Sequence, residues 1–177
     1  MIKFFKYFFY LPFIAFSEDI FQKDQLSDHL SGLAPFIGKT FIGEFINSTP
    51  KNPIYDVIYW ERILNGDAVQ VTHSVNDGEF GGERIIIWDP EETKVVSWYF
   101  ATGGLITKSI IDIRLKELIS IEDVSKNNTS ITKIKTIYKI MSNGDLNCKI
   151  KYFMNNVWVD AHELVYREVL NKKVIFK

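Results

Sequence analysis

The stretch IYDVIYWERIL-NG-DAVQVTHSV-NDG-EFGGERIIIW-DPEE-TKVVSWYFAT-GG, residues 54–104, decides the fold of this chain. Four segments rich in apolar and β-branched residues alternate there with short turn signals, among them Asn65-Gly66 and Asn76-Asp77-Gly78. Asn, Asp and Gly tolerate the positive φ that tight hairpin turns require. The stretch therefore predicts consecutive hairpins, and an antiparallel meander of this length has to close or fold over to cover its edges.

The same pattern continues on both sides of this stretch. One strand is expected before it, at 40–47, and five follow it, which brings the total to ten. Leucines recur at the spacing of one helical face over 24–33, which predicts a short helix. Hairpin-linked strands in this number predict an all-β, antiparallel up-and-down β-barrel with a short N-terminal helix, and its interior is wider than that of an eight-stranded barrel, which side chains can fill. The later strands are expected at 105–114, 118–124, 130–141, 146–154 and 157–169, with a short closing strand at 174–176.

The first seventeen residues, MIKFFKYFFYLPFIAFS, have the composition of a secretory signal peptide. Lys3 and Lys6 precede an uncharged run of only ten residues, whereas crossing a bilayer takes roughly 20. The alternative is a retained interfacial anchor. We therefore expect a signal peptide over 1–17 and a single domain over 18–177, exported to the periplasm or the extracellular space.

The charge of the chain is nearly balanced, with 21 Lys and Arg against 22 Asp and Glu and a net charge of -1. Nothing in this balance favours nucleic acid as a partner. Lysines share one face of each of two neighbouring strands, and on a lipid-facing wall each would cost about 2–4 kcal/mol. We therefore expect a soluble barrel whose mature form does not insert into a membrane. These lysines are Lys133, Lys135, Lys139, Lys149 and Lys151.

The segment LAPFIGKTFIGEF, which starts at Leu33, resembles the opening of calycin-type barrels, a group that includes lipocalin-like and nitrobindin-like domains. Gly38, Thr40 and Gly43 match part of the Gly-x-Trp or Gly-Thr-Trp-x-Gly signature of these barrels. The chain departs from that signature in two places, because Lys39 is inserted and Phe41 stands where tryptophan is usual. The resemblance implies a barrel fold and leaves the function open.

The stretch 78–99 is similar to the middle hairpins of small uncharacterised lipocalin-like domains. In nitrobindin-like barrels a histidine near the C-terminal strand binds haem iron, and this resemblance makes His162 a haem-ligand candidate. Asp160 and Glu168 share its strand face, which is typical of a position that faces solvent. His162 is therefore a weak candidate, and no cofactor is expected.

The densest group of polar and aromatic residues lies where the second and third strands pair. The turn after Arg62 places it, Trp60 and Glu61 across from the strand that carries His73. Valines share the strand face of His73, so this histidine is expected to point inward. It is either a buried histidine satisfied by a hydrogen bond to a neighbour such as Glu61, or a group that orients a ligand in an apolar pocket.

Further candidates come from the remaining strands. Arg84 and the glutamate before it point to opposite faces, so at most one of them faces the interior. Glu163 is expected to be an inward carboxylate with Arg62 as its partner. Trp98 and Tyr138 are either core fillers or rings that stack on a ligand. The predicted ligand-binding residues are Trp60, Glu61, Arg62, His73, Arg84, Trp98, Tyr138 and Glu163.

Motifs of known enzymes and metal sites are missing from the sequence. Cys148 is the only cysteine, which excludes an intramolecular disulfide, and it is expected to be a buried, unreactive thiol. The sequence contains no nucleophile elbow, no zinc-protease helix and no phosphate-binding glycine loop, and its three histidines lack zinc-ligand spacing. Catalysis is therefore not the leading expectation, although an acid/base pair of Glu61 and His73 stays open.

The leading hypothesis is an exported, soluble barrel that binds a small, largely apolar ligand in its interior. A small lipophilic molecule is then the expected partner, and no protein partner is identified. One alternative is a non-catalytic structural or interaction module with a filled barrel and an exposed apolar patch on its outer wall. The other is a haem-binding or catalytic barrel.

Overall fold

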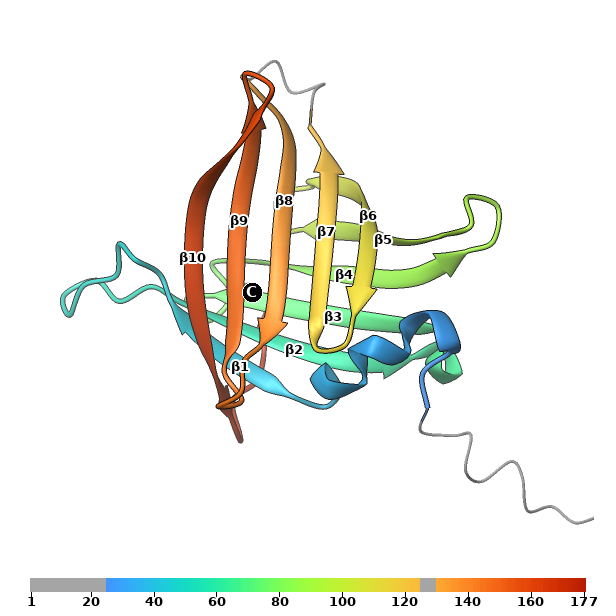
Figure 1. Ribbon diagram of the computed structural model, residues 1–177. Coiled ribbons are helices and arrows are strands. Elements are labelled where there is room, and N and C mark those ends of the chain that lie inside the picture. Colours follow the sequence, from blue (N-terminus) through green and yellow to red (C-terminus); the bar gives the residue numbers. More distant parts are fainter. Residues whose placement is uncertain (1–24, 125–129) are drawn as a thin grey trace, which may run out of the picture.

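The structure is a computed structural model that describes residues 25–124 and 130–177, in which ten antiparallel strands close into a barrel (Figure 1). Strands that follow one another in the sequence are paired, and β1 closes the sheet by pairing with both β2 and β10. The predicted all-β, up-and-down barrel is confirmed. The strands are β1 (Thr40–Glu44), β2 (Tyr55–Ile63), β3 (Ala68–Val75), β4 (Phe80–Asp89), β5 (Lys94–Ala101), β6 (Ile106–Arg114), β7 (Glu117–Asp123), β8 (Ile131–Ile140), β9 (Leu146–Met154) and β10 (Val157–Val169).

The turn between β2 and β3 shows why the chain needs asparagine and glycine there. A short 3-10 turn, η3 (Leu64–Gly66), joins the strands, with φ at 56° for Asn65 and 100° for Gly66. The Ser27 amide donates a hydrogen bond to the Gly66 carbonyl oxygen at 2.9 Å, and a Cβ on Gly66 would lie 2.1 Å from the Gln25 carbonyl oxygen. Glycine alone combines that φ with so close an approach. The turn therefore also anchors the segment that leads into the barrel.

One end of the barrel is covered by the 3-10 helix η2 (Asp28–Phe36), which packs against β4, β6 and β7 (Figure 1). Leu30, Leu33 and Phe36 are fully buried. They recur every three residues, which is the repeat of a 3-10 helix. An N-terminal helix is thus confirmed, but the predicted span of 24–33 and its α-helical repeat are wrong, because the helix turns more tightly and runs on to Phe36.

Strand β10 changes face at a β-bulge between Asp160 and His162. Before the bulge Val159 pairs with Tyr152, and after it Leu164 pairs with Cys148. Tyr152 and Cys148 have the same parity on β9, so the inward positions of β10 move from odd to even numbers across the bulge. A strict alternation read along the whole strand therefore assigns half of it to the wrong face.

The predicted closing strand at 174–176 is wrong. The C-terminal segment instead lies along the outer face of the β3–β4 hairpin. The Ile175 amide donates to Ser74 Oγ at 3.2 Å, and a Cβ on Gly81 would lie 3.1 Å from the Phe176 ring. Gly81 has no side chain, so the Phe176 ring can pack against the β3–β4 hairpin at this position.

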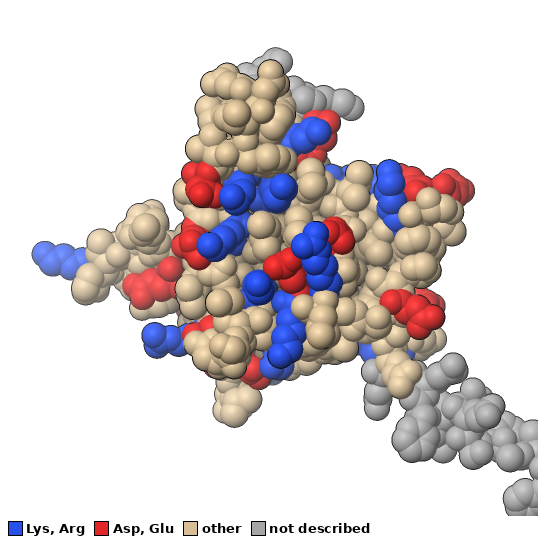
Figure 2. Space-filling view, viewed as in Figure 1, with Lys and Arg blue, Asp and Glu red and all other residues tan. Residues whose placement is uncertain are grey.

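The lysines of β8 and β9 lie on the outer wall, where Figure 2 shows basic and acidic side chains mixed on one face. Lys149 Nζ lies 3.2 Å from Glu163 Oε1, and Lys151 Nζ lies 2.8 Å from Asp160 Oδ1. Within the part of the chain that the structure describes, no helix is long and apolar enough to cross a membrane. The predicted signal peptide over 1–17 lies outside the described residues.

Candidate functional site

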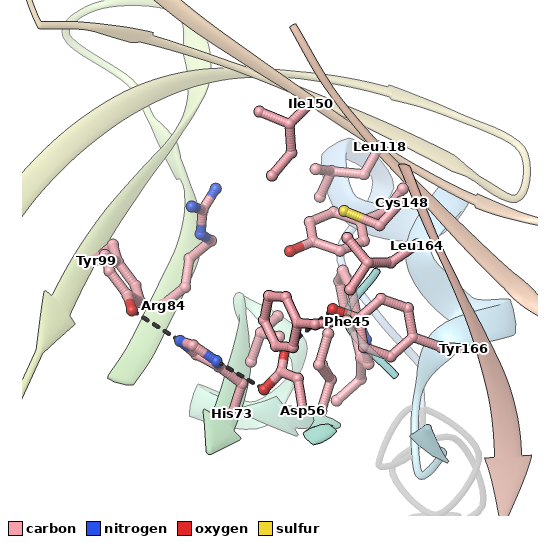
Figure 3. A pocket seen from close by; sticks show the side chains of 14 residues that line it. Phe45, Asp56, His73, Arg84, Tyr99, Leu118, Cys148, Ile150, Leu164 and Tyr166 are labelled. Atoms are coloured by element: carbon pink, nitrogen blue, oxygen red, sulfur yellow. Dashed lines mark hydrogen bonds and ion pairs between the residues drawn. The ribbon is translucent and has the colours of Figure 1, made fainter. Parts of the chain in front are cut away.

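A cavity of about 220 Å³ lies inside the barrel, between two walls of different chemistry (Figure 3). The wall from β7, β9 and β10 is mainly apolar, whereas the wall from β2 to β5 carries most of the charged and hydrogen-bonding groups. This division is the pattern of a small-molecule pocket, in which a few polar groups orient a largely apolar ligand. The apolar wall includes Leu118, Cys148, Ile150 and Leu164, and the polar wall includes Asp56, His73, Arg84 and Tyr99.

The polar wall is built around a chain of three hydrogen bonds (Figure 3). Tyr166 Oη donates to Asp56 Oδ2 at 3.0 Å, and His73 Nδ1 lies 3.0 Å from Asp56 Oδ1. His73 Nε2 lies 2.7 Å from the hydroxyl of Tyr99. Asp56 is only 5% exposed, so these charge-assisted bonds offset the cost of burying its carboxylate. These three hydrogen bonds therefore hold four side chains, from β2, β3, β5 and β10, in one arrangement.

Chemistry decides the direction of these bonds. A carboxylate only accepts, so His73 Nδ1 carries a proton that it donates to Asp56. In the tautomer with its hydrogen on Nδ1, the ring accepts at Nε2 from the Tyr99 hydroxyl. Burial raises the pKa of Tyr99 to about 12, against a smaller lowering by the Arg84 cation. Burial also raises the pKa of Tyr166, followed by the Asp56 charge. Both phenols thus keep their protons at neutral pH.

Arg84 projects from β4 into the space between Tyr99 and Ile150 (Figure 3). Its Nη1 donates to Ser120 Oγ at 2.9 Å, and its guanidinium carbon lies 5.6 Å from the centre of the Tyr99 ring. Among the described residues no carboxylate lies within ion-pair distance of Arg84. Burial raises the pKa of Glu122, and Arg84 lowers it by less. Arg84 is therefore a half-buried cation for which residues 25–124 and 130–177 provide no ion pair.

Trp60 closes the cavity on the side of the N-terminal helix. The indole is 1% exposed, with the Phe36 ring at 4.7 Å and the edge of Tyr138 at 5.7 Å between ring centres. Its Nε1–H is buried and has no hydrogen-bond partner among the described residues. A buried donor left without an acceptor costs about 1–3 kcal/mol, so this N–H is a destabilising feature of the packing around Trp60.

Cys148 on β9 and Tyr138 on β8 pair across the two strands, and both line the cavity. Burial raises the pKa of Cys148 to about 12, and it also raises the pKa of Tyr138. The thiol is 3% exposed, so the predicted burial of Cys148 is confirmed. A protonated thiol at neutral pH contributes a small apolar surface to the wall.

Half of the predicted site residues line this cavity. Trp60, His73, Arg84 and Tyr138 do so, and of the pair at the start of β4 it is the arginine that points inward. The predicted hydrogen bond from His73 to Glu61 is wrong, because Glu61 is exposed on the outer face and pairs across the strands with Gln70. The carboxylate that His73 contacts is Asp56.

The other three predicted residues lie away from the cavity. Arg62 points to the closed end of the barrel, where its Nε donates to the Gln25 carbonyl oxygen at 2.9 Å. Trp98 is 42% exposed on the outer wall, under the Lys108 ammonium at 5.4 Å. Glu163 points outward to Lys149, so the predicted pair with Arg62 is wrong. The bulge in β10 is the reason, since it reverses the faces of that strand.

His162 does not line the cavity. It is exposed and meets the ring of Tyr152 edge-on, with 6.1 Å between ring centres. Across residues 25–124 and 130–177, no group of three His, Cys, Asp or Glu side chains is placed to hold a metal ion. Haem ligation by His162 stays a prediction.

Sequence reasoning missed Asp56, Tyr99 and Tyr166. A signal for Asp56 was present, because it alternates with Ile58 and Trp60 on the inward face of β2. Tyr99 pairs with Arg84 across β4 and β5, so an inward Arg84 implies an inward Tyr99. Tyr166 could not be placed from its own strand without knowledge of the bulge.

These features define a class: a closed, ten-stranded antiparallel barrel with a partly polar interior cavity. No protein-family model matches the chain, and no curated protein matches it in sequence. The cavity and its contacts therefore carry the functional argument.

Proposed function

We propose that this protein is a calycin-like barrel, exported and soluble, that binds a small, largely apolar ligand in its interior. The observation that carries the proposal is the cavity, in which an apolar wall faces an ordered chain of hydrogen bonds. An engineered apolar cavity of roughly 150 Å³ admits benzene. A cavity of about 220 Å³ therefore suits one ring with a short substituent better than a long acyl chain.

The state of the polar wall supports binding over catalysis. A nucleophile or general base needs a pKa matched to its task. Tyr99, the group at the cavity end of the Asp56–His73 pair, has its pKa raised to about 12, so it does not supply a phenolate at neutral pH. Both nitrogens of His73 are already engaged. A fixed and satisfied set of this kind is suited to orienting a ligand, because it loses little entropy on binding.

The test is a titration of ¹⁵N-labelled protein with toluene and benzyl alcohol, followed by NMR. Ile150→Phe fills the cavity from β9 and should lower the affinity about tenfold or more, since the ligand and the new ring compete for one volume. Ile137→Phe is the matched control, because Ile137 alternates with the cavity residue Tyr138 and points to the outer wall. Saturable binding that both variants retain unchanged would contradict an interior site.

The interaction module is a second candidate, and one observation favours it. The outer face of β5 and β6 exposes a set of large apolar side chains next to one another in the register. If this face carries the function, replacing Trp98 and Phe100 with serine should abolish self-association measured by light scattering, whereas cavity variants should leave it unchanged. The exposed side chains are Trp98, Phe100, Ile106 and Ile110, at 42%, 44%, 60% and 47%.

A further inference from the structure

Arg84 lines the cavity, can only donate hydrogen bonds, and has N–H groups left without an acceptor among the described residues. Arg84 makes one hydrogen bond among the described residues, to Ser120, and its planar fork carries five N–H groups. Trp60 also lines the cavity, but its indole N–H, which has no partner among the described residues, is buried in the packing and exposes no surface. Val71 on β3 lies between these two residues in the sheet, because it pairs with Trp60 on β2 and with Arg84 on β4. The side chains of Trp60 and Arg84 both point inward. Arg84 therefore has N–H groups available for an acceptor in the cavity.

The carboxylates inside the barrel do not supply that acceptor. Asp56 already accepts from His73 and Tyr166 through its two oxygens, and it forms no ion pair with Arg84. Glu122 also faces Arg84, and burial raises its pKa while Arg84 lowers it by less, but no ion pair joins the two side chains. Arg84 is half-buried, and a guanidinium that is partly withdrawn from water is stabilised by an anionic partner. Among the described residues the polar wall supplies no such partner.

We propose that the ligand is a small carboxylic acid with an apolar body, bound as the carboxylate by Arg84. This inference rests on the proposed function and names the chemical class of its ligand. A carboxylate matches the arginine fork, which recognises two oxygens in one plane. The apolar body then lies against Leu118, Ile150 and Leu164 on the opposite wall (Figure 3).

The size of the cavity narrows the class. One ring with a one- or two-carbon acid arm, or a short branched acid, suits about 220 Å³. Phenylacetate is a suitable probe, and phenylacetamide is its neutral counterpart with nearly the same shape. The amide keeps one acceptor oxygen but loses the charge and the second acceptor, so the pair isolates what Arg84 recognises.

The experiment measures the dissociation constants of phenylacetate and phenylacetamide by NMR titration of the full chain. We expect the acid to bind about tenfold or more tightly than the amide, because hydrogen bonds between charged partners are about twice as strong as neutral ones. The indole N–H signal of Trp60, one of four tryptophans, should shift with the acid. Arg84→Met should remove the preference for the acid while amide binding stays.

Two further variants keep the result interpretable. Arg114→Met removes an exposed arginine on β6 that pairs with Asp112, so it changes the net charge equally and should leave the preference intact. Arg84→Lys keeps the charge without the planar fork and should keep part of the preference. It also serves if Arg84→Met does not fold.

The outcomes separate the two proposals. Equal affinity for acid and amide, or a preference that survives Arg84→Met, overturns the carboxylic-acid class and leaves the cavity as a site for neutral ligands. No binding of either probe, together with no binding of toluene or benzyl alcohol, overturns the ligand-binding function itself. If Arg114→Met removes the preference for the acid as fully as Arg84→Met does, that preference comes from the net charge of the protein, and the role of Arg84 is overturned.

Discussion

The two ends of the barrel interior use the same strands for opposite purposes. At the closed end, Leu30, Leu33 and Phe36 of η2 fill the space between the strands and leave no exposed side-chain surface. At the other end, Asp56, His73 and Arg84 face a cavity. Strand β2 contributes to both, because Arg62 caps the closed end while Asp56 faces the cavity.

The difference separates stability from function. Apolar side chains that are fully buried contribute to the free energy of unfolding through the hydrophobic effect and close packing. Buried polar groups contribute little net stability, but they fix one arrangement of hydrogen bonds. The closed end should therefore determine whether the protein folds, and the cavity end should determine what it binds.

The largest expected effect is at the closed end. Phe36→Ala should lower the free energy of unfolding by about 3–5 kcal/mol, because it empties a fully buried position beside Trp60. Urea denaturation measures the change. Ile46→Ala, at a position that is 91% exposed, is the control and should stay within about 0.5 kcal/mol of the parent. A loss below about 1 kcal/mol for Phe36→Ala would mean that the helix does not plug the barrel.

The next largest effect is expected for the hydrogen bonds that Asp56 makes inside the barrel. Asp56→Asn should lower the free energy of unfolding by about 1–3 kcal/mol, since an amide accepts through one oxygen where the carboxylate accepts from both His73 and Tyr166. Asp112→Asn, at an exposed carboxylate, is the matched control for the loss of charge. If the free energy of unfolding falls by the same small amount in both variants, the hydrogen bonds of Asp56 have no structural role.

Arg84 is the position where the largest change in binding is expected, and its replacement should have a smaller effect on stability. Arg84→Met should change the free energy of unfolding by less than about 1 kcal/mol, because Arg84 has no ion pair to lose and methionine covers similar apolar surface. The same variant should lose the preference for the acid. A strong destabilisation would instead make Arg84 part of the core and would weaken the contrast between the two ends.

The smallest effect at neutral pH concerns Cys148. Burial raises the pKa of its thiol from 9.0 to about 12, so the folded state holds a proton that the unfolded chain releases above about pH 9. Its contribution to stability is therefore present below pH 9 and is lost as the pH rises towards 12. At pH 8 the native thiol should react with a disulfide reagent on the order of a hundredfold more slowly than the denatured chain. Equal rates would place the thiol in solvent.

The fold could be predicted from the sequence because its signals are local. Asn65 and Gly66 mark a turn by their own backbone preferences, and β-strand alternation assigns Trp60 and His73 to the interior. The helix was misjudged because three-residue and four-residue repeats of leucine overlap over a short span. The turn signal and the strand alternation can both be recognised without knowledge of distant parts of the chain.

The site was only partly predictable because it depends on non-local geometry. Glu61 was a plausible partner for His73 by proximity along the paired strands, yet the hydrogen bond goes to Asp56, which shares the inward face. The faces of Glu163 and Tyr166 are reversed by a bulge for which the sequence shows no distinct marker. The unmatched donors of Arg84 and Trp60 emerge only once every acceptor around them has been placed.

The proposed ligand site is the cavity between the two walls of the barrel. Chemical-shift mapping with phenylacetate, on protein labelled at methyl groups and backbone amides, distinguishes this site from the outer wall. We expect saturable shifts of the Trp60 indole N–H and of the methyl groups of Leu118, Ile150 and Leu164. Saturable shifts confined to Ile106 and Ile110 on the outer wall, with the cavity methyl groups unmoved, would contradict it.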